Sequence, residues 1–139
     1  MNTTSLYNIL EKENINYSNH RLCNSNGMIA HCKDLTVIIV DEKKTNTNIL
    51  RNTVLIQELG HYFSGSYYKT NSPYELIDKL EYKADKKAWE EFFPYPEIKK
   101  LMKQGLTTVT ELSEYFDVEA PYMARCLNYY YNKYNQFKD

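Results

Sequence analysis

Three residues near the middle of the chain have the types and the spacing of a metal-assisted hydrolytic site. Gln57, Glu58 and His61 lie in one apolar-rich run, and His61 follows Gln57 by four positions. In the zinc-peptidase pattern H-E-x-x-H, two histidines at this spacing share a helix face and hold zinc, while the glutamate activates a water molecule. Glu58 and His61 therefore occupy the positions of the general base and the second ligand. Gln57 replaces the first histidine.

Glu81 is the residue that could complete such a site from a second helix. A capping-box pattern with proline at the first helical position, SPYE at residues 72–75, predicts a helix that extends to about Phe92. With about 100° of rotation per residue, Glu81 falls inside the apolar stripe of this helix, which contains Ile77, Leu80, Ala84 and Ala88. Burial of an unpaired carboxylate costs on the order of several kcal/mol. Glu81 is therefore expected to have a cation, strong hydrogen-bond donors or a raised pKa.

Structural roles for the same residues remain alternatives. Glu58 could be solvated on a surface helix face, with His61 a half-buried histidine that has an ordinary hydrogen-bond partner. Glu81 could pair with Arg51 or a lysine instead of a metal. His20 and His31 are expected on strand surfaces, although His31 would lie near the site if its strand borders the helix of residues 48–63.

The bulk composition excludes several classes of function. The chain has 139 residues, 25% of them charged, and a net charge of −1, so no global basic field would attract nucleic acid or an acidic membrane. The first residues lack a signal-peptide pattern, and no run of about 18 apolar residues occurs. The three cysteines show no C-x-x-C spacing, which suits reduced thiols. We therefore expect a cytoplasmic protein with no membrane partner.

The remaining elements predict an α+β fold, in which a small antiparallel or mixed sheet packs on the helix of Glu58 and on a second helix with Glu81. Residues 1–104 are expected to form a zincin-like domain, and residues 105–139 a helical C-terminal extension packed on it. The turn residues 24–27 predict a hairpin between flanking strands. The expected helices are 4–13, 48–63, 73–92, 97–103 and two within 107–139, and the expected strands are 16–23, 28–32 and 35–40.

With these helices placed, the chain resembles the ImmA/IrrE family of zinc metallopeptidases over nearly its whole length. The resemblance rests on the strand 35–40, on LIQELGHYF at residues 55–63, and on EYKADKKA at residues 81–88. It implies that Glu58 is the general base and that His61 and Glu81 are zinc ligands. It also implies a phage or mobile-element anti-repressor, which cuts a helix-turn-helix repressor.

The chain departs from the family pattern at Gln57. An amide oxygen is a weaker ligand for zinc than imidazole, so weak zinc binding, another metal and a degenerate site all remain open. The expected function is zinc-dependent proteolysis of a helix-turn-helix repressor, with Gln57 as a doubtful third ligand. The alternative is an inactive family member that regulates a repressor by binding it.

The C-terminal residues resemble the opening of a helix-turn-helix. Residues 107–139 contain three Lys or Arg against five Asp or Glu, a net charge of −2. A DNA-binding segment needs cations that neutralise phosphates. Direct binding of nucleic acid is therefore the least expected function, and a structural or repressor-docking role is favoured for this segment.

Overall fold

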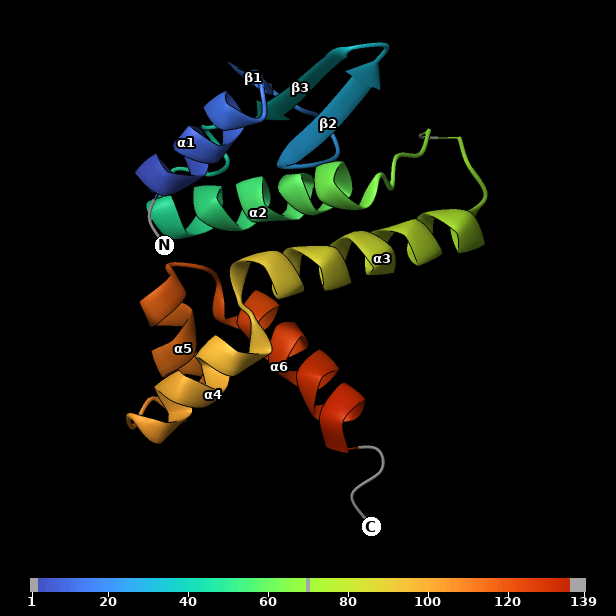
Figure 1. The fold of residues 1–139 in the computed structure, drawn as a ribbon. Coiled ribbons are helices and arrows are strands. Elements are labelled where there is room, and N and C mark those ends of the chain that lie inside the picture. The colour runs from blue at the N-terminus through green and yellow to red at the C-terminus, as the bar shows by residue number, and fades with distance from the viewer. Residues whose placement is uncertain (1–2, 70, 136–139) are drawn as a thin grey trace.

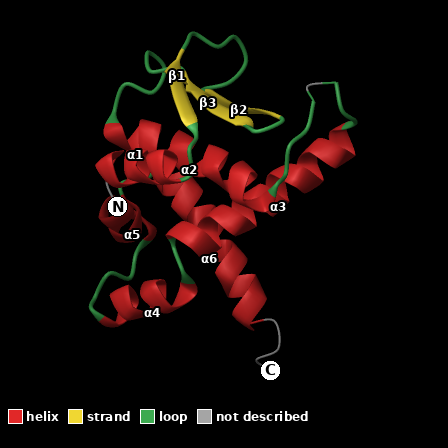
Figure 2. Cartoon of the chain, turned by 45° about the horizontal axis from the view of Figure 1, so that its top comes forward, coloured by secondary structure: helices red, strands yellow, loops and turns green. Residues whose placement is uncertain are grey.

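The computed structural model describes residues 3–69 and 71–135 and has the expected α+β architecture (Figure 1). A small sheet lies on one side of two long antiparallel helices, and three shorter helices lie on the other (Figure 2). The elements in chain order are α1 (Thr3–Lys12), β1 (Asn16–Asn19), β2 (Gly27–Cys32), β3 (Leu35–Val40), α2 (Asn48–Ser64), α3 (Tyr74–Phe92), α4 (Tyr95–Lys103), α5 (Val109–Phe116) and α6 (Ala120–Asn135).

The three strands form a mixed sheet in the order β1-β3-β2, with the most apolar strand at the centre. β1 pairs with β3 in parallel, and β2 pairs with β3 antiparallel. The predicted hairpin between residues 16–23 and 28–32 is therefore wrong. The hairpin joins β2 to β3 instead, through a tight turn in which Lys33 has a φ of 55°.

Asp41 explains why residues 20–26 form a loop and not a hairpin turn. Its buried carboxylate accepts hydrogen bonds from the backbone N–H of Leu22 at 2.9 Å and from the guanidinium of Arg21 at 3.1 Å. These hydrogen bonds lower the Asp41 pKa to about 2 in spite of the opposing effect of burial. The N–H of Leu22 has the largest effect, and the N–H groups of Lys44 and Arg21 add to it. The loop is thus attached to the end of β3, which keeps β1 apart from β2.

α2 is the central element of the fold. Thr47 caps its start by accepting a hydrogen bond from the N–H of Leu50, and Gly65 ends it in the left-handed conformation with a φ of 66°. Leu55, Ile56 and Leu59 are fully buried on this helix. α2 packs against the sheet on one side and against α3 on another (Figure 1).

Gly60 allows α2 and α3 to approach very closely. A Cβ atom at this position would lie 2.5 Å from the carbonyl oxygen of Ala84 and 2.9 Å from the Cβ of Ala88. Such a contact is far inside van der Waals distance, so only glycine fits without a shift. This contact point adjoins His61 in the sequence and therefore sets how near α3 comes to the candidate site.

The predicted start of α3 needs two corrections. Pro73 precedes the helix, and no side chain caps it, because the Ser72 hydroxyl accepts a hydrogen bond from the backbone N–H of Lys69. Of the predicted apolar stripe, only Ala84 and Ala88 are buried, while Ile77 and Leu80 are half-buried. In Figure 1 the first half of α3 extends past the end of α2, which leaves this part of the stripe without a helix against it.

The C-terminal helices share the hydrophobic core of the rest of the chain. α5 begins with a complete capping box between Thr108 and Glu111. The side chain of Asn52 in α2 donates a hydrogen bond to the carbonyl oxygen of Asp117 at 3.1 Å. The core is one cluster that includes Leu55, Phe93, Phe116 and Met123. Among the described residues, the helices lack the combination of length and apolarity needed to cross a membrane.

Candidate active site

His61 lies in the last turn of α2 and has a fixed orientation. Its side chain is buried, and its Nδ1 lies 2.7 Å from the carbonyl oxygen of Ser66, to which it donates a hydrogen bond. Ser66 is held there because Gly65 turns the chain and the Ser66 N–H bonds back to the His61 carbonyl oxygen at 3.1 Å. The turn after α2 therefore directs Nε2 of His61 away from the backbone.

The carboxylate of Glu81 in α3 accepts a hydrogen bond from that nitrogen. The Nε2 of His61 lies 3.1 Å from Oε1 of Glu81, and the hydroxyl of Tyr68 donates a hydrogen bond to the same oxygen. The hydrogen bond from His61 lowers the Glu81 pKa, against burial, and Tyr68 adds to the effect. The prediction of a buried carboxylate is wrong, because the Glu81 side chain is 41% exposed. The cation and the donor expected for Glu81 are both present.

The contact between His61 and Glu81 is charge-assisted in the metal-free chain. Burial disfavours the imidazolium form of His61, but the Glu81 carboxylate and the Ser66 carbonyl together outweigh burial and raise its pKa to about 9. At neutral pH the pair is therefore an imidazolium with a carboxylate. A cation that binds between these two groups must displace the proton on Nε2.

Glu58 lies one residue beyond Gln57 on α2 and is half-buried beside this pair. Burial raises its pKa to about 7, and the nearby Glu81 carboxylate adds to this rise while His61 opposes it. A carboxyl group with a pKa near neutrality can both accept and return a proton at physiological pH. Glu58 thus has the property expected of a general base.

These residues line a hollow of about 320 Å³ that is bordered by α2, α3 and the start of β2. Gly27 brings β2 onto α2, since a Cβ at this position would lie 2.4 Å from Cγ1 of Val54. Tyr67 also lines the hollow, and its ring stacks on that of His31 with 5.1 Å between centroids. His31 itself is exposed on β2, so it lies near the site without lining it.

Gln57 does not join this group. It is half-buried on α2 and is not among the residues that line the hollow. The spacing placed Gln57, Glu58 and His61 in one sector of the helix, but the hollow lies over the part of that sector shared by Glu58 and His61. Within residues 3–69 and 71–135, no group of three or more His, Cys, Asp or Glu side chains is arranged to hold a metal ion.

Two of the ligands that the sequence suggested, His61 and Glu81, are placed where they could bind a divalent cation. The Ser66 carbonyl holds the proton on Nδ1 of His61, so Nε2 is the nitrogen that could bind a metal once its own proton is lost, as is usual for metal-binding histidines. The Nε2 of His61 and Oε1 of Glu81 already converge at the edge of the hollow. His61 and Glu81 could therefore hold a metal ion, and Gln57 would need a different side-chain position to become a third ligand.

Tyr68, Ser66 and Gly27 are site residues that the sequence did not indicate. Tyr68 and Ser66 follow the helix in a segment without periodicity, and Gly27 was interpreted as a turn residue. Comparisons with known protein families, with curated proteins and with solved structures find no match to this chain.

Proposed function

We propose that this chain is a zincin-like metallopeptidase in which His61 and Glu81 hold zinc and Glu58 is the general base. The observation that supports it best is the convergence of His61, Glu81 and Glu58 on one hollow, with Nε2 of His61 3.1 Å from Oε1 of Glu81. The three side chains come from two helices and have the chemical types that zinc hydrolases use.

The protein groups divide the work of peptide hydrolysis as follows. Zinc, when bound, lowers the pKa of a water molecule toward neutrality and polarises a carbonyl group. Glu58 would accept a proton from a water molecule in the hollow, a role that its pKa of about 7 suits. The Ser66 carbonyl keeps the His61 ring in place, and the Tyr68 hydroxyl does the same for the Glu81 carboxylate.

An extended peptide suits the shape of the site. β2 is an edge strand, because among the described strands it pairs only with β3. Its first residues, Gly27 to Ile29, line the hollow next to Glu58. A substrate strand can add to such an edge through main-chain hydrogen bonds. From the resemblance to ImmA/IrrE proteins, we propose a helix-turn-helix repressor as the substrate.

A second candidate function is regulation of the repressor by binding alone. It is favoured by the position of Gln57, which leaves His61 and Glu81 as the two ligands facing the hollow. Peptide-hydrolysing zinc sites use three protein ligands. In this case the hollow and the β2 edge would bind a repressor segment without cutting it. We propose the cytoplasm as the location in both cases, since Cys23 and Cys32 are exposed free thiols.

The decisive experiment measures zinc content, zinc affinity and cleavage of a helix-turn-helix repressor, the proposed substrate. For the peptidase, the wild type binds zinc and cuts the repressor, Gln57→His strengthens both, and Glu58→Gln abolishes cleavage while zinc binding remains. Absence of zinc binding and cleavage in the wild type, with neither gained in Gln57→His, would exclude the peptidase. Relief of repression by Glu58→Gln at the wild-type level would support regulation by binding.

A further inference from the structure

A groove of about 600 Å³ lies between α4 and α6, apart from the candidate active site. Its lining residues all differ from those of the hollow around Glu58 and His61, so a ligand here would not need the peptidase chemistry. The volume falls within the range of small-molecule sites, roughly 300 to 1,000 Å³, and such sites often lie between the helices of a bundle. We refer to this feature as the α4–α6 groove.

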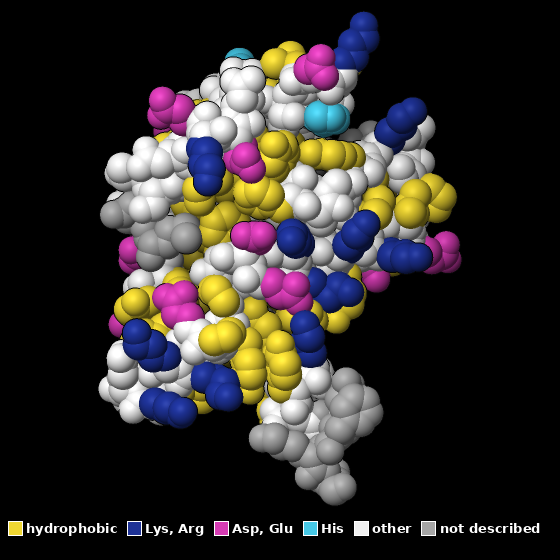
Figure 3. Space-filling view, viewed as in Figure 1, with side chains coloured by type: hydrophobic (Ala, Val, Ile, Leu, Met, Phe, Trp, Pro, Cys, Tyr) yellow, Lys and Arg dark blue, Asp and Glu magenta, His cyan; other side chains and the backbone are white. Residues whose placement is uncertain are grey.

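The α4 wall of the groove is apolar at its floor and cationic at its rim. Ile98 is 2% exposed at the floor, and Met102 is 44% exposed. Measured from Ile98 at about 100° per residue, Met102 lies at about 40° around the helix. Lys99 follows at about 100° and Lys103 at about 140°, and both residues are exposed. In Figure 3 lysine side chains gather over α4 beside a continuous hydrophobic patch. The two lysines therefore border the open edge of the groove.

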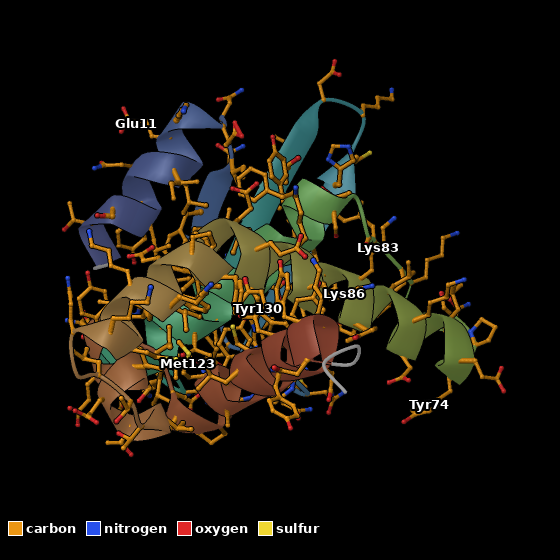
Figure 4. The ribbon with its side chains drawn as sticks, turned by 60° about the horizontal axis from the view of Figure 1, so that its bottom comes forward. Glu11, Tyr74, Lys83, Lys86, Met123 and Tyr130 are labelled. Carbon is orange, nitrogen blue, oxygen red and sulfur yellow. The ribbon has the colours of Figure 1, made fainter. Side chains whose placement is uncertain are left out.

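The α6 wall has the same gradient but ends in amides. Tyr130 is 4% exposed, and its hydroxyl hydrogen bonds to backbone carbonyl oxygens at the end of α3 (Figure 4). The polar atom of this side chain is thus satisfied within the protein, and its ring forms apolar floor. Measured from Tyr130, Leu127 lies at about 60° and Tyr131 at about 100°. Asn135 and Asn128 follow at about 140° and 160°, so they form the second rim.

The charge along the groove is of one sign. Lys99 and Lys103 are its charged lining residues, and the described residues that line it include no Asp or Glu. The Nζ of Lys99 lies 5.3 Å from the centroid of the Tyr95 ring, so a cation–π contact holds this ammonium group beside the groove. An anionic group that enters the groove would therefore meet two cations and no carboxylate.

The apolar surface at the groove is limited in extent. The part of α4 that lines it, within residues 95–103, is about 12 Å long. Of the large apolar side chains that are exposed among the described residues, Met102 and Tyr131 line the groove. A stable protein interface buries about 800 Å² on each partner. The size of the groove therefore favours a small molecule over a protein segment as its occupant.

We propose that the α4–α6 groove binds a small amphipathic anion, a molecule with an apolar chain and one anionic head group, such as a free fatty acid. The chain would lie over Ile98, Met102 and Tyr130, where burial of each CH₂ group improves affinity about fourfold. The head group would lie at the rim, with Lys99 and Lys103 as its cations. A ligand of about 14 non-hydrogen atoms is expected to bind with a Kd of about 0.1 mM.

Isothermal titration calorimetry of the full chain with sodium dodecanoate, below its micelle concentration, tests the proposal. One dodecanoate should bind per chain. Decanoate, whose chain is shorter by two CH₂ groups, should bind about tenfold more weakly. Dodecyltrimethylammonium has the same chain length with a cationic head group, and it should bind at least tenfold more weakly than dodecanoate. NMR chemical shifts should change on dodecanoate binding in α4 and α6 and not around the candidate active site.

Variants of exposed residues separate the head-group contact from the chain contact. Lys99→Gln with Lys103→Gln should weaken dodecanoate binding about tenfold without weakening that of dodecyltrimethylammonium. Met102→Ser should weaken the binding of both. Lys79→Gln with Lys83→Gln makes the same charge change on α3, where Figure 4 shows Lys83, and should leave dodecanoate binding unchanged. All these positions are exposed, so circular dichroism should show wild-type folding.

Four results would overturn the proposal. The first is the absence of saturable dodecanoate binding up to about 1 mM, ten times the expected Kd. The second is binding that neither the Lys99 and Lys103 pair nor Met102→Ser weakens, which would place the site elsewhere. The third is equal or tighter binding of dodecyltrimethylammonium. The fourth is binding of an acidic peptide, anionic phospholipid vesicles or duplex DNA through Lys99 and Lys103 by a chain that does not bind dodecanoate, which would assign the groove to another occupant.

Discussion

Replacement of Gly60 by alanine tests whether close packing of α2 on α3 determines the geometry of the site. The new Cβ would lie 2.5 Å from the carbonyl oxygen of Ala84, and a backbone atom cannot rotate away as a side chain can. Overpacking of this kind costs about 3 kcal/mol. Alanine in place of glycine inside a helix returns about 1 kcal/mol. The net loss in the free energy of unfolding is therefore about 2 kcal/mol.

The assay is thermal and urea unfolding followed by circular dichroism. For a chain of this size, about 1 kcal/mol corresponds to a shift of roughly 4 °C, so Tm should fall by about 8 °C. Because α3 must move away, the distance between His61 and Glu81 should also grow. The pKa of His61, raised to about 9 in the wild type, should then fall, and NMR titration of the ring measures this change.

A second variant identifies which atom causes the clash. Ala88→Gly removes the contact at 2.9 Å but leaves the closer contact with the Ala84 oxygen. Gly60→Ala combined with Ala88→Gly should therefore remain less stable than the wild type by at least the loss of Gly60→Ala alone. A rise in Tm for Gly60→Ala, as helix propensity alone would produce, would refute the reasoning about this contact. Full rescue in the double variant would show that the backbone contact is not limiting.

Three further predictions concern other parts of the fold. The pKa of Asp41 is lowered to about 2, so its ionised carboxylate stabilises the fold above the unfolded-state pKa near 4. This stabilisation is lost as the pH falls through about 2. Urea unfolding of Asp41→Asn should therefore depend less on pH across this range than that of the wild type. Burial raises the pKa of the Cys126 thiol, whereas Cys23 and Cys32 are exposed. A thiol reagent should therefore label two of the three cysteines quickly. Rapid labelling of all three in the folded protein would contradict the burial of Cys126. Loss of the α5 capping box in Thr108→Ala should cost about 1 kcal/mol in urea unfolding, while Thr110→Ala in the first turn of the same helix serves as the control and should show no such loss.

The helices are the part of the fold that the sequence alone determined best. Helix formation depends on neighbours within four residues, so caps and periodicity give the bounds of α2 and the end of α3 at Phe92 within about two residues. The same local rule places Glu58 and His61 on one sector of α2. The apolar run at 35–40 likewise indicated the central strand of the sheet.

Only the tertiary structure decided how the strands pair and which residues surround the hollow. Strand pairing joins distant segments, and the attachment of residues 20–26 to Asp41 has no periodic signal in the sequence. The phase of a helix likewise gives the angles between its side chains but not the direction in which a cavity lies. For that reason the shared sector of Gln57, Glu58 and His61 was predictable, while the exclusion of Gln57 from the hollow depended on where α3 and β2 pack.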